Sequence, residues 1–176
     1  LAAGICVLPV LVTGGIHLDG FCDTADALAS HQDTEKKLQI LKDPHMGAFA
    51  AIWLGCYFIA QFALAVTAAQ TQADLTALAF GYCISRSLSG LAVAGFPLAK
   101  NSGLAYTFAE YADKKRVRTI LSILTVVLCI AVCVFCGIKG IFVSVAAAAT
   151  FLYYRFRLIG KFGGLSGDLA GWFVQM

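Results

Sequence analysis

Residues 13–47 read TGGIHLDGFCDTADALASHQDTEKKLQILKDPHMG, a polar stretch in a chain that is 60% hydrophobic. The stretch contains five of the chain's eight aspartates and all three of its histidines. Apolar sequence lies on both sides of it. Because packing alone does not select a polar segment between apolar ones, we expect this stretch to carry the function.

The spacing of three aspartates in this stretch is specific. Asp19, Asp23 and Asp26 are four and three residues apart, which places their carboxylates on one face of a helix, where like charges repel. A divalent cation between them relieves the repulsion, and Mg²⁺ prefers oxygen ligands. The spacing predicts a metal site at these three residues, with Mg²⁺ as the cofactor. The alternative is a solvated helix face, which would mix in lysine or glutamate, whereas the first lysine is Lys36.

The composition indicates a membrane protein. Charged residues make up 13% of the 176 residues, against about 25% in ordinary globular proteins. The net charge of +3 does not suggest a nucleic-acid partner. We therefore expect an all-α, polytopic transmembrane helix bundle in a lipid bilayer. The chain starts inside one apolar run and stops soon after another begins, so we expect residues 1–176 to be one integral-membrane domain, truncated at both ends.

Apolar runs of membrane-spanning length predict the individual helices. The first run is expected to kink at Pro9, and a short amphipathic helix is expected to begin at Thr34 and to end before Pro44. The apolar runs cover Leu1–Ile16, Ala48–Ala69, Leu75–Leu98, Thr119–Tyr154 as two spans joined at residues 137–140, and a last segment from Leu169.

Basic residues alternate between the loops that join these runs. The five loops carry three, none, five, one and three lysines or arginines in chain order. The positive-inside rule then places the first, third and fifth loops in the cytoplasm. It also predicts an active site on the cytoplasmic face, because the aspartates that we single out lie at that side: Asp19, Asp23, Asp26, Asp43 and Asp168.

Three segments resemble one known family. They are GGIHLDGFCDTADAL (residues 14–28), KDPHMGAF (42–49) and GGLSGDLAGWFVQ (163–175), and they are similar to the cobalamin synthase family, the adenosylcobinamide-GDP ribazoletransferases. The resemblance spans nearly the whole chain and implies a longer protein in the bacterial inner membrane. It implies that adenosylcobinamide-GDP and alpha-ribazole, or its 5'-phosphate, react to give adenosylcobalamin, or its 5'-phosphate, and GMP.

In that reaction the ribose 3'-hydroxyl attacks the phosphorus next to cobinamide and GMP leaves, which requires positioning and charge neutralisation. We expect Asp19, Asp23, Asp26 and Asp43 to be catalytic, with Asp43 completing the metal site or accepting the hydroxyl proton. Arg86 lies inside an apolar run and is expected to neutralise phosphate charge, although an ion pair or a backbone-carbonyl contact that holds helices together would explain it equally. The expected substrate-binding residues are His17, Gly20, His45, Arg86, Gly164, Gly167 and Asp168.

Two further expectations concern the loops and the competing function. Asn101, Ser102 and Gly103 follow Lys100 in the third loop and are expected to be able to approach a ligand. The alternative function is a cation-coupled transporter that uses intramembrane aspartates, which would place the carboxylates near the bilayer midplane. The sequence leaves open whether the protein forms a homo-oligomer.

Overall fold

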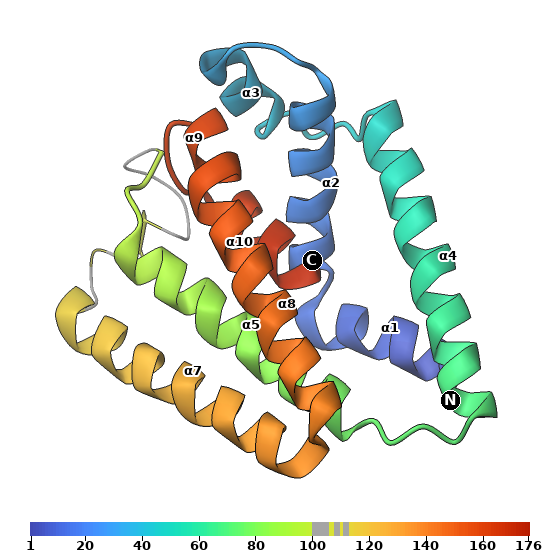
Figure 1. The fold of residues 1–176 in the computed structure, drawn as a ribbon. Helices are drawn as coiled ribbons and strands as arrows, with labels where there is room; N and C mark the ends of the chain where they lie inside the picture. The colour runs from blue at the N-terminus through green and yellow to red at the C-terminus, as the bar shows by residue number, and fades with distance from the viewer. Residues whose placement is uncertain (100–105, 108–109, 111–112) are drawn as a thin grey trace.

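The structure, a computed structural model, describes residues 1–99, 106–107, 110 and 113–176 (Figure 1). Regular structure in these residues is helical, and their only β-type pairing is an isolated parallel bridge between Leu98 and Leu165. The predicted all-α class is confirmed. The helices are α1 (Ala2–Thr13), α2 (Ile16–Ala29), α3 (Thr34–Ile40), α4 (Ala48–Gln70), α5 (Thr76–Gly95), α7 (Lys114–Cys136), α8 (Ile138–Tyr153), the π-helix η1 (Tyr154–Leu158), α9 (Ile159–Lys161) and α10 (Gly167–Gln175).

Four helical segments of the described residues are long and apolar enough to cross a membrane. They are α4, α5, α7 and the stretch Ile138–Lys161 that joins α8, η1 and α9. Large apolar side chains point outward from them, such as Ile59 and Phe135, which are both 73% exposed. Exposed apolar surface of this extent is stable when lipid covers it. The predicted polytopic transmembrane bundle is therefore confirmed.

The first apolar run does not continue straight into the aspartate helix. Helix α1 contains Pro9 and runs on to Thr13, and then Gly14 and Gly15 adopt left-handed conformations with φ of 63° and 80°. Glycine adopts such angles without steric cost. Helix α2 leaves this turn at 94° to α1, and the pair counts as a fifth apolar span only if it is taken as one bent segment.

The first, third and fifth loops lie at the same end of the bundle. The Thr34 hydroxyl of the first loop donates to the carbonyl of Lys161 at 3.4 Å. The amide of Ala99 in the third loop donates to the carbonyl of Leu165 in the fifth at 2.9 Å, and the amide of Leu165 donates to the carbonyl of Pro97 at 2.8 Å. We call this end the odd-loop end.

The second and fourth loops lie at the opposite end of the bundle (Figure 1). Asp74 of the second loop accepts hydrogen bonds from the backbone and hydroxyl of Thr76, and it is attracted to Lys139 beside the α7–α8 turn. The three loops that are rich in basic residues therefore share one end of the bundle, and the two loops that are poor in them share the other, as the alternation in the sequence predicts. The assignment of the odd-loop end to the cytoplasm stays a prediction.

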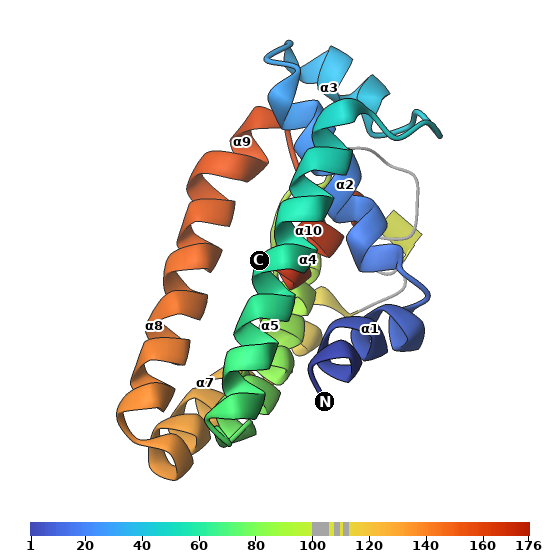
Figure 2. The ribbon, with the colours of Figure 1, turned by 90° about the vertical axis from the view of Figure 1, so that its right-hand side faces the viewer.

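Helix α10 lies inside the bundle, beside α2 and α5 (Figure 2). Its aromatic side chains pack on the fully buried Tyr154 of η1, with ring centres 4.9 Å away for Phe173 and 6.3 Å for Trp172. Leu169 is also fully buried. Apolar burial thus fixes α10 next to the helix that carries the aspartates.

Candidate functional site

The three aspartates of the sequence pattern lie on α2, as the spacing predicts. Asp19 is exposed, and Asp23 and Asp26 are half-buried. The opposite face of α2 carries the buried Phe21 and Ala25, which turn toward the other helices. The helix is therefore amphipathic within the bundle, and its polar face forms one wall of the site.

Helices α2 and α10 approach each other through two glycines. A Cβ atom on Gly20 would lie 2.6 Å from the carbonyl oxygen and 2.9 Å from the Cα of Asp168. A Cβ on Gly171 would lie 3.2 Å from the Cα and the carbonyl oxygen of His17. Only glycine permits the first of these contacts, so Gly20 is needed for the packing of the two backbones.

This contact brings Asp168 to the aspartates of α2. Asp23 is repelled by four carboxylates, most strongly by Asp19, then by Asp168, and less by Asp26 and Asp43. Asp168 lies in the first turn of α10, where the helix dipole favours an anion. The hydroxyl of Ser166 donates to Asp168 at 3.4 Å and accepts a hydrogen bond from the amide of Leu169. Ser166 therefore caps α10, a role that the sequence did not predict.

The acidic cluster is the name used below for these five aspartates, Asp19, Asp23, Asp26, Asp43 and Asp168.

Asp26 also binds the start of another helix. Its Oδ2 accepts the amide of Gly47 at 2.7 Å and its Oδ1 accepts the amide of Ala50 at 2.8 Å. These amides belong to the N-terminus of α4, which has no helical partner for them and favours negative charge. A Cβ on Gly47 would lie 2.5 Å from Oδ2 of Asp26, so this contact also needs glycine. Since each oxygen keeps a second lone pair, the assignment of Asp26 as a metal ligand stays a prediction.

Asp43 and His45 form a pair at the edge of the cluster. Oδ1 of Asp43 lies 2.7 Å from Nδ1 of His45 and accepts the backbone amide of His45 at 3.0 Å. These hydrogen bonds hold the pKa of Asp43 below its ordinary value. The carboxylate is therefore ionised and can only accept, which places a proton on Nδ1 of His45; in the neutral ring Nε2 is then the acceptor. Both side chains are open to solvent.

Arg86 lies on α5 and faces outward, with its guanidinium 5.8 Å from the centre of the Tyr82 ring. It is close enough to His17, at the start of α2, to interact with it electrostatically. No carboxylate among the described residues lies within 4.0 Å of Arg86. The ion-pair explanation for this arginine therefore has no support in the described part of the chain, and its positive charge is available beside α2.

The glycines of the fifth loop differ in their surroundings. Gly164 has φ of 152°, and a Cβ there would lie 2.5 Å from the amide nitrogen of Ala99, so this glycine serves the crossing of the third and fifth loops. Gly167, at the start of α10, has no such neighbour within 4 Å and is open. Substrate binding by either residue stays a prediction. Residues 100–103, which include Asn101, Ser102 and Gly103, lie outside the described residues.

The acidic cluster offers oxygen ligands for a cation. Its donors are carboxylate oxygens, which suit Mg²⁺, and the crowding of negative charge around Asp23 would be relieved by a divalent cation. Among the described residues, however, no three Asp, Glu, His or Cys side chains converge as a ready-made metal centre. Mg²⁺ is commonly held by one or two carboxylates together with water and substrate phosphates. The cluster fits that mode, in which Asp19 and Asp23 would be the protein ligands, and Mg²⁺ binding stays a prediction.

Comparison with known proteins identifies the family. The family model of cobalamin-5-phosphate synthase matches residues 1–176. Proteins named adenosylcobinamide-GDP ribazoletransferase are similar to this chain: one from Lachnoclostridium phytofermentans is 40% identical over 99% of the chain and 66% of its own length, and one from Clostridium perfringens strain 13 is 32% identical over 100% and 70%. A third, from Pseudomonas syringae pv. syringae, is 30% identical over 99% and 70%.

The chain thus spans about two thirds of the length of these relatives. No solved structure matches it significantly. The match of the family model from the first residue to the last, together with these relatives, shows that this chain belongs to the cobalamin-5-phosphate synthase family.

Proposed function

We propose that this protein is an adenosylcobinamide-GDP ribazoletransferase of cobalamin biosynthesis. It joins adenosylcobinamide-GDP to alpha-ribazole, or to its 5'-phosphate, and releases GMP. The observation that carries this proposal is the family match over the whole chain, with relatives of that name at up to 40% identity. The acidic cluster on α2 and α10 supplies the kind of site that phosphoryl transfer needs.

The acidic cluster positions the diphosphate. Bound Mg²⁺ would supply positive charge between the carboxylates of Asp19 and Asp23 and the phosphate oxygens. Asp168 faces this position from α10, and Arg86 adds a second positive charge beside the start of α2. Asp26 positions α2 against α4 through its two backbone hydrogen bonds. Mg²⁺ dependence is part of the proposal.

The Asp43–His45 pair accepts the proton of the attacking hydroxyl. A hydrogen-bonded carboxylate whose pKa is lowered is a poor base, so Asp43 itself is less suited to this step. In the neutral ring of His45, Nδ1 donates to Asp43 and Nε2 is the acceptor. Asp43 then holds the imidazole in the required tautomer, and His45 takes the proton from the ribose 3'-hydroxyl.

The experiment that tests the function is product formation by the full-length protein in lipid. We expect GMP release that requires both substrates and Mg²⁺ and that stops when the metal is chelated. The competing transporter hypothesis predicts ion flux across sealed vesicles without GMP release. Flux without product would overturn the proposal, and product that forms equally well after complete metal removal would overturn its metal part alone.

The proposed orientation places the acidic cluster at the cytoplasmic side of the inner membrane. In a background without native cysteines, a cysteine in place of Lys115 should react with a membrane-impermeant thiol reagent only from the cytoplasmic side. A cysteine in place of Ala73, in the second loop, is the matched control and should react only from the other side. The reverse labelling pattern would contradict the orientation. A homo-oligomer stays a prediction.

A further inference from the structure

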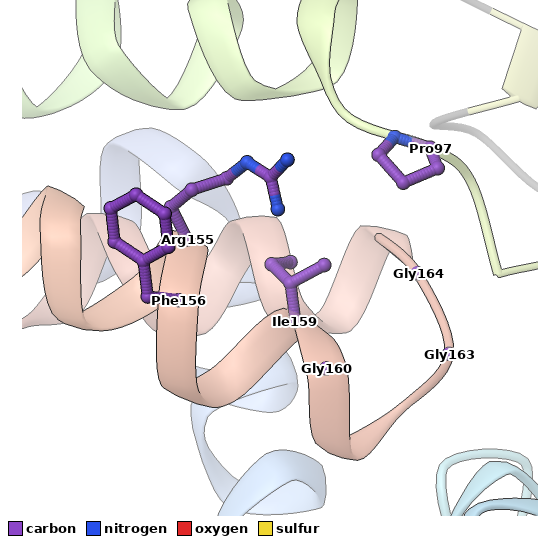
Figure 3. A pocket seen from close by; sticks show the side chains of 7 residues that line it. All are labelled: Pro97, Arg155, Phe156, Ile159, Gly160, Gly163 and Gly164. Carbon is purple, nitrogen blue, oxygen red and sulfur yellow. The ribbon is translucent and has the colours of Figure 1, made fainter.

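A separate pocket lies at the odd-loop end of the bundle, away from the acidic cluster. It has a volume of about 320 Å³ and is lined by Pro97 of the third loop, by Arg155 and Phe156 of η1, by Ile159 and Gly160 of α9, and by Gly163 and Gly164 of the fifth loop (Figure 3). None of the five carboxylates of the acidic cluster lines it. Gly164, a predicted substrate-binding residue, lines this pocket, and the function proposed above gives no role to the other lining residues.

Arg155 is the charged group of this pocket. Its guanidinium lies 5.0 Å from the centre of the Phe96 ring and 5.9 Å from that of Phe156. Figure 3 shows the guanidinium directed toward the space that Pro97 and Ile159 border. Within the described ranges, no carboxylate lies within 4.0 Å of Arg155. A cation held by aromatic rings, without an acidic partner, attracts an anion.

The pocket lies toward one end of an apolar segment that is long enough to span a membrane. Arg155 lies six residues before the end of the apolar segment Ile138–Lys161, which is about 9 Å along a helix. Phe156 is 71% exposed and faces away from the protein core. The pocket therefore combines a positive charge with an apolar surface near the end of a membrane span.

Local backbone structure keeps this pocket open. Tyr154 and Leu158, at the two ends of the π-helical turn, are fully buried, while Arg155 and Phe156 between them are exposed. Such π-turns recur at binding sites in helices. A Cβ on Gly160 would meet no atom within 4 Å, so the backbone there is bare and leaves room for a ligand.

We propose that this pocket binds the phosphate of an anionic phospholipid. Arg155 pairs with the phosphate, and Phe156 and Ile159 contact the glycerol and the first methylenes of the acyl chains. Basic pockets between membrane helices bind acidic lipid headgroups in this way. A soluble phosphate compound offers the same anion, but the apolar wall and the exposed Phe156 favour a ligand that carries a hydrocarbon body.

The test uses the full-length protein in a neutral detergent, with thermal unfolding measured while phosphatidylglycerol is added. Phosphatidylcholine and inorganic phosphate are the two comparison ligands. We expect stabilisation by phosphatidylglycerol alone, and an apparent affinity about fivefold weaker in Arg155→Gln, as expected for the loss of one basic contact near a lipid phosphate. Arg157→Gln is the matched control, since Arg157 is an exposed arginine of the same turn that does not line the pocket.

Two more variants keep the test decisive if Arg155→Gln does not fold. Arg155→Lys keeps the charge and should retain the preference for phosphatidylglycerol. Gly160→Leu fills the pocket without removing the charge and should weaken the effect. Equal stabilisation of the parent protein, Arg155→Gln and Gly160→Leu would overturn the proposal. Inorganic phosphate that stabilises the protein as well as the lipid does, and in the same Arg155-dependent way, would overturn the lipid and identify a soluble phosphate as the ligand.

Discussion

Helices α2 and α10 pack backbone against backbone, and so do α7 and α8, but the two pairs bring different residues together. In α7–α8 the glycine is Gly140, which leaves no room for a Cβ beside the carbonyl of Val132. The two helices follow one another through a turn at Gly137, and Sγ of Cys133 on α7 lies 3.8 Å from the hydroxyl of Ser144 on α8. In α2–α10 the glycine is Gly20, and the facing residue is Asp168, which lies far away in the sequence.

The difference shows what holds the acidic cluster together. Placing Asp168 near Asp19 and Asp23 costs free energy because like charges repel. Leu169, Trp172 and Phe173 of α10 are buried, and their van der Waals packing against the surrounding helices favours this position of α10. Packing on one side of α10 thus holds Asp168 near Asp23, and a bound cation would relieve the repulsion around Asp23. In the α7–α8 pair, no repulsion between carboxylates opposes the packing of the two helices.

The largest expected effect comes from the centre of the cluster. Asp23→Asn should lower GMP release by about 10²- to 10³-fold, because it removes charge at the phosphate-binding position. Thermal unfolding should occur at an unchanged or higher temperature, since the substitution relieves repulsion from four carboxylates. Cys133→Ala, at the α7–α8 contact, is the control and should leave turnover intact. Near-normal turnover in Asp23→Asn would show that the α2–α10 pair, like the α7–α8 pair, does not carry the reactive site.

Asp168→Asn separates a functional role from a capping role. If Asp168 is a ligand or positions a phosphate, removal of its charge should lower turnover about 10²-fold. If Asp168 only stabilises the N-terminus of α10, the substitution should lower the free energy of unfolding by at most about 1 kcal/mol and leave turnover almost unchanged. Ser166→Ala removes the cap hydroxyl and is the matched control for stability. Crosslinking of cysteines at positions 168 and 19 measures their proximity independently.

Alanine at the two glycine contacts tests the comparison directly. Gly20→Ala and Gly140→Ala both place a methyl group where a neighbouring backbone lies, and each should cost about 1–3 kcal/mol. Only Gly20→Ala should also lower turnover of the folded fraction, by about tenfold, because it moves Asp168 away from Asp23. Activity per folded molecule, measured beside thermal unfolding, separates the two results. A similar loss of turnover in Gly140→Ala would show that any packing defect disturbs the site.

The contact between Asp26 and α4 should give a smaller effect. Gly47→Ala pushes the α4 N-terminus away from the Asp26 carboxylate, and loss of these capping bonds should cost about 1–2 kcal/mol. If Asp26 mainly positions α4, the Mg²⁺ concentration for half-maximal activity should stay constant in Gly47→Ala and in Asp26→Asn. A large rise in that concentration for Asp26→Asn alone would assign Asp26 to the metal instead.

The smallest expected effect is at the opposite end of the bundle. Hydrogen bonds from Thr76 lower the pKa of Asp74 from its ordinary value of 3.8. A lowered folded pKa means that Asp74 stabilises the protein above pH 3.8 and loses this contribution as the pH falls through the folded pKa. Asp74→Ala should therefore unfold at a slightly lower temperature at neutral pH, and the difference should vanish at acid pH. A difference that grows at acid pH would contradict this sign.

Much of this architecture follows from the sequence. Apolar runs predict α4, α5 and the α7–α8 hairpin to within a few residues, except that α7 begins earlier, at Lys114. The numbers of basic residues in the loops predict which loops share an end of the bundle, because these numbers do not depend on how the side chains pack. The aspartate spacing predicts one helical face, because that periodicity is a local property of the backbone.

Other features depend on contacts between distant segments. The pairing of Gly14 and Gly15 permits a bend, but its angle of 94° results from the packing of α1 and α2 against α4. The resemblance of residues 163–175 to a family motif suggested a site, but not that α10 would dock on α2 through Gly20. The engagement of Asp26 by the start of α4 gives no signal in the spacing, because an aspartate that caps a distant helix and one that binds a metal have the same sequence pattern.

By itself the sequence determined the helices, their membrane character, the grouping of the loops and the aspartate stripe, since these depend on periodicity, length and charge within short segments. Only the tertiary structure decided that Asp168 joins the stripe and that Arg155 lies in a pocket of its own. Each of these arrangements depends on where side chains meet in space, and that is set by how glycine contacts and buried aromatic rings fit segments together.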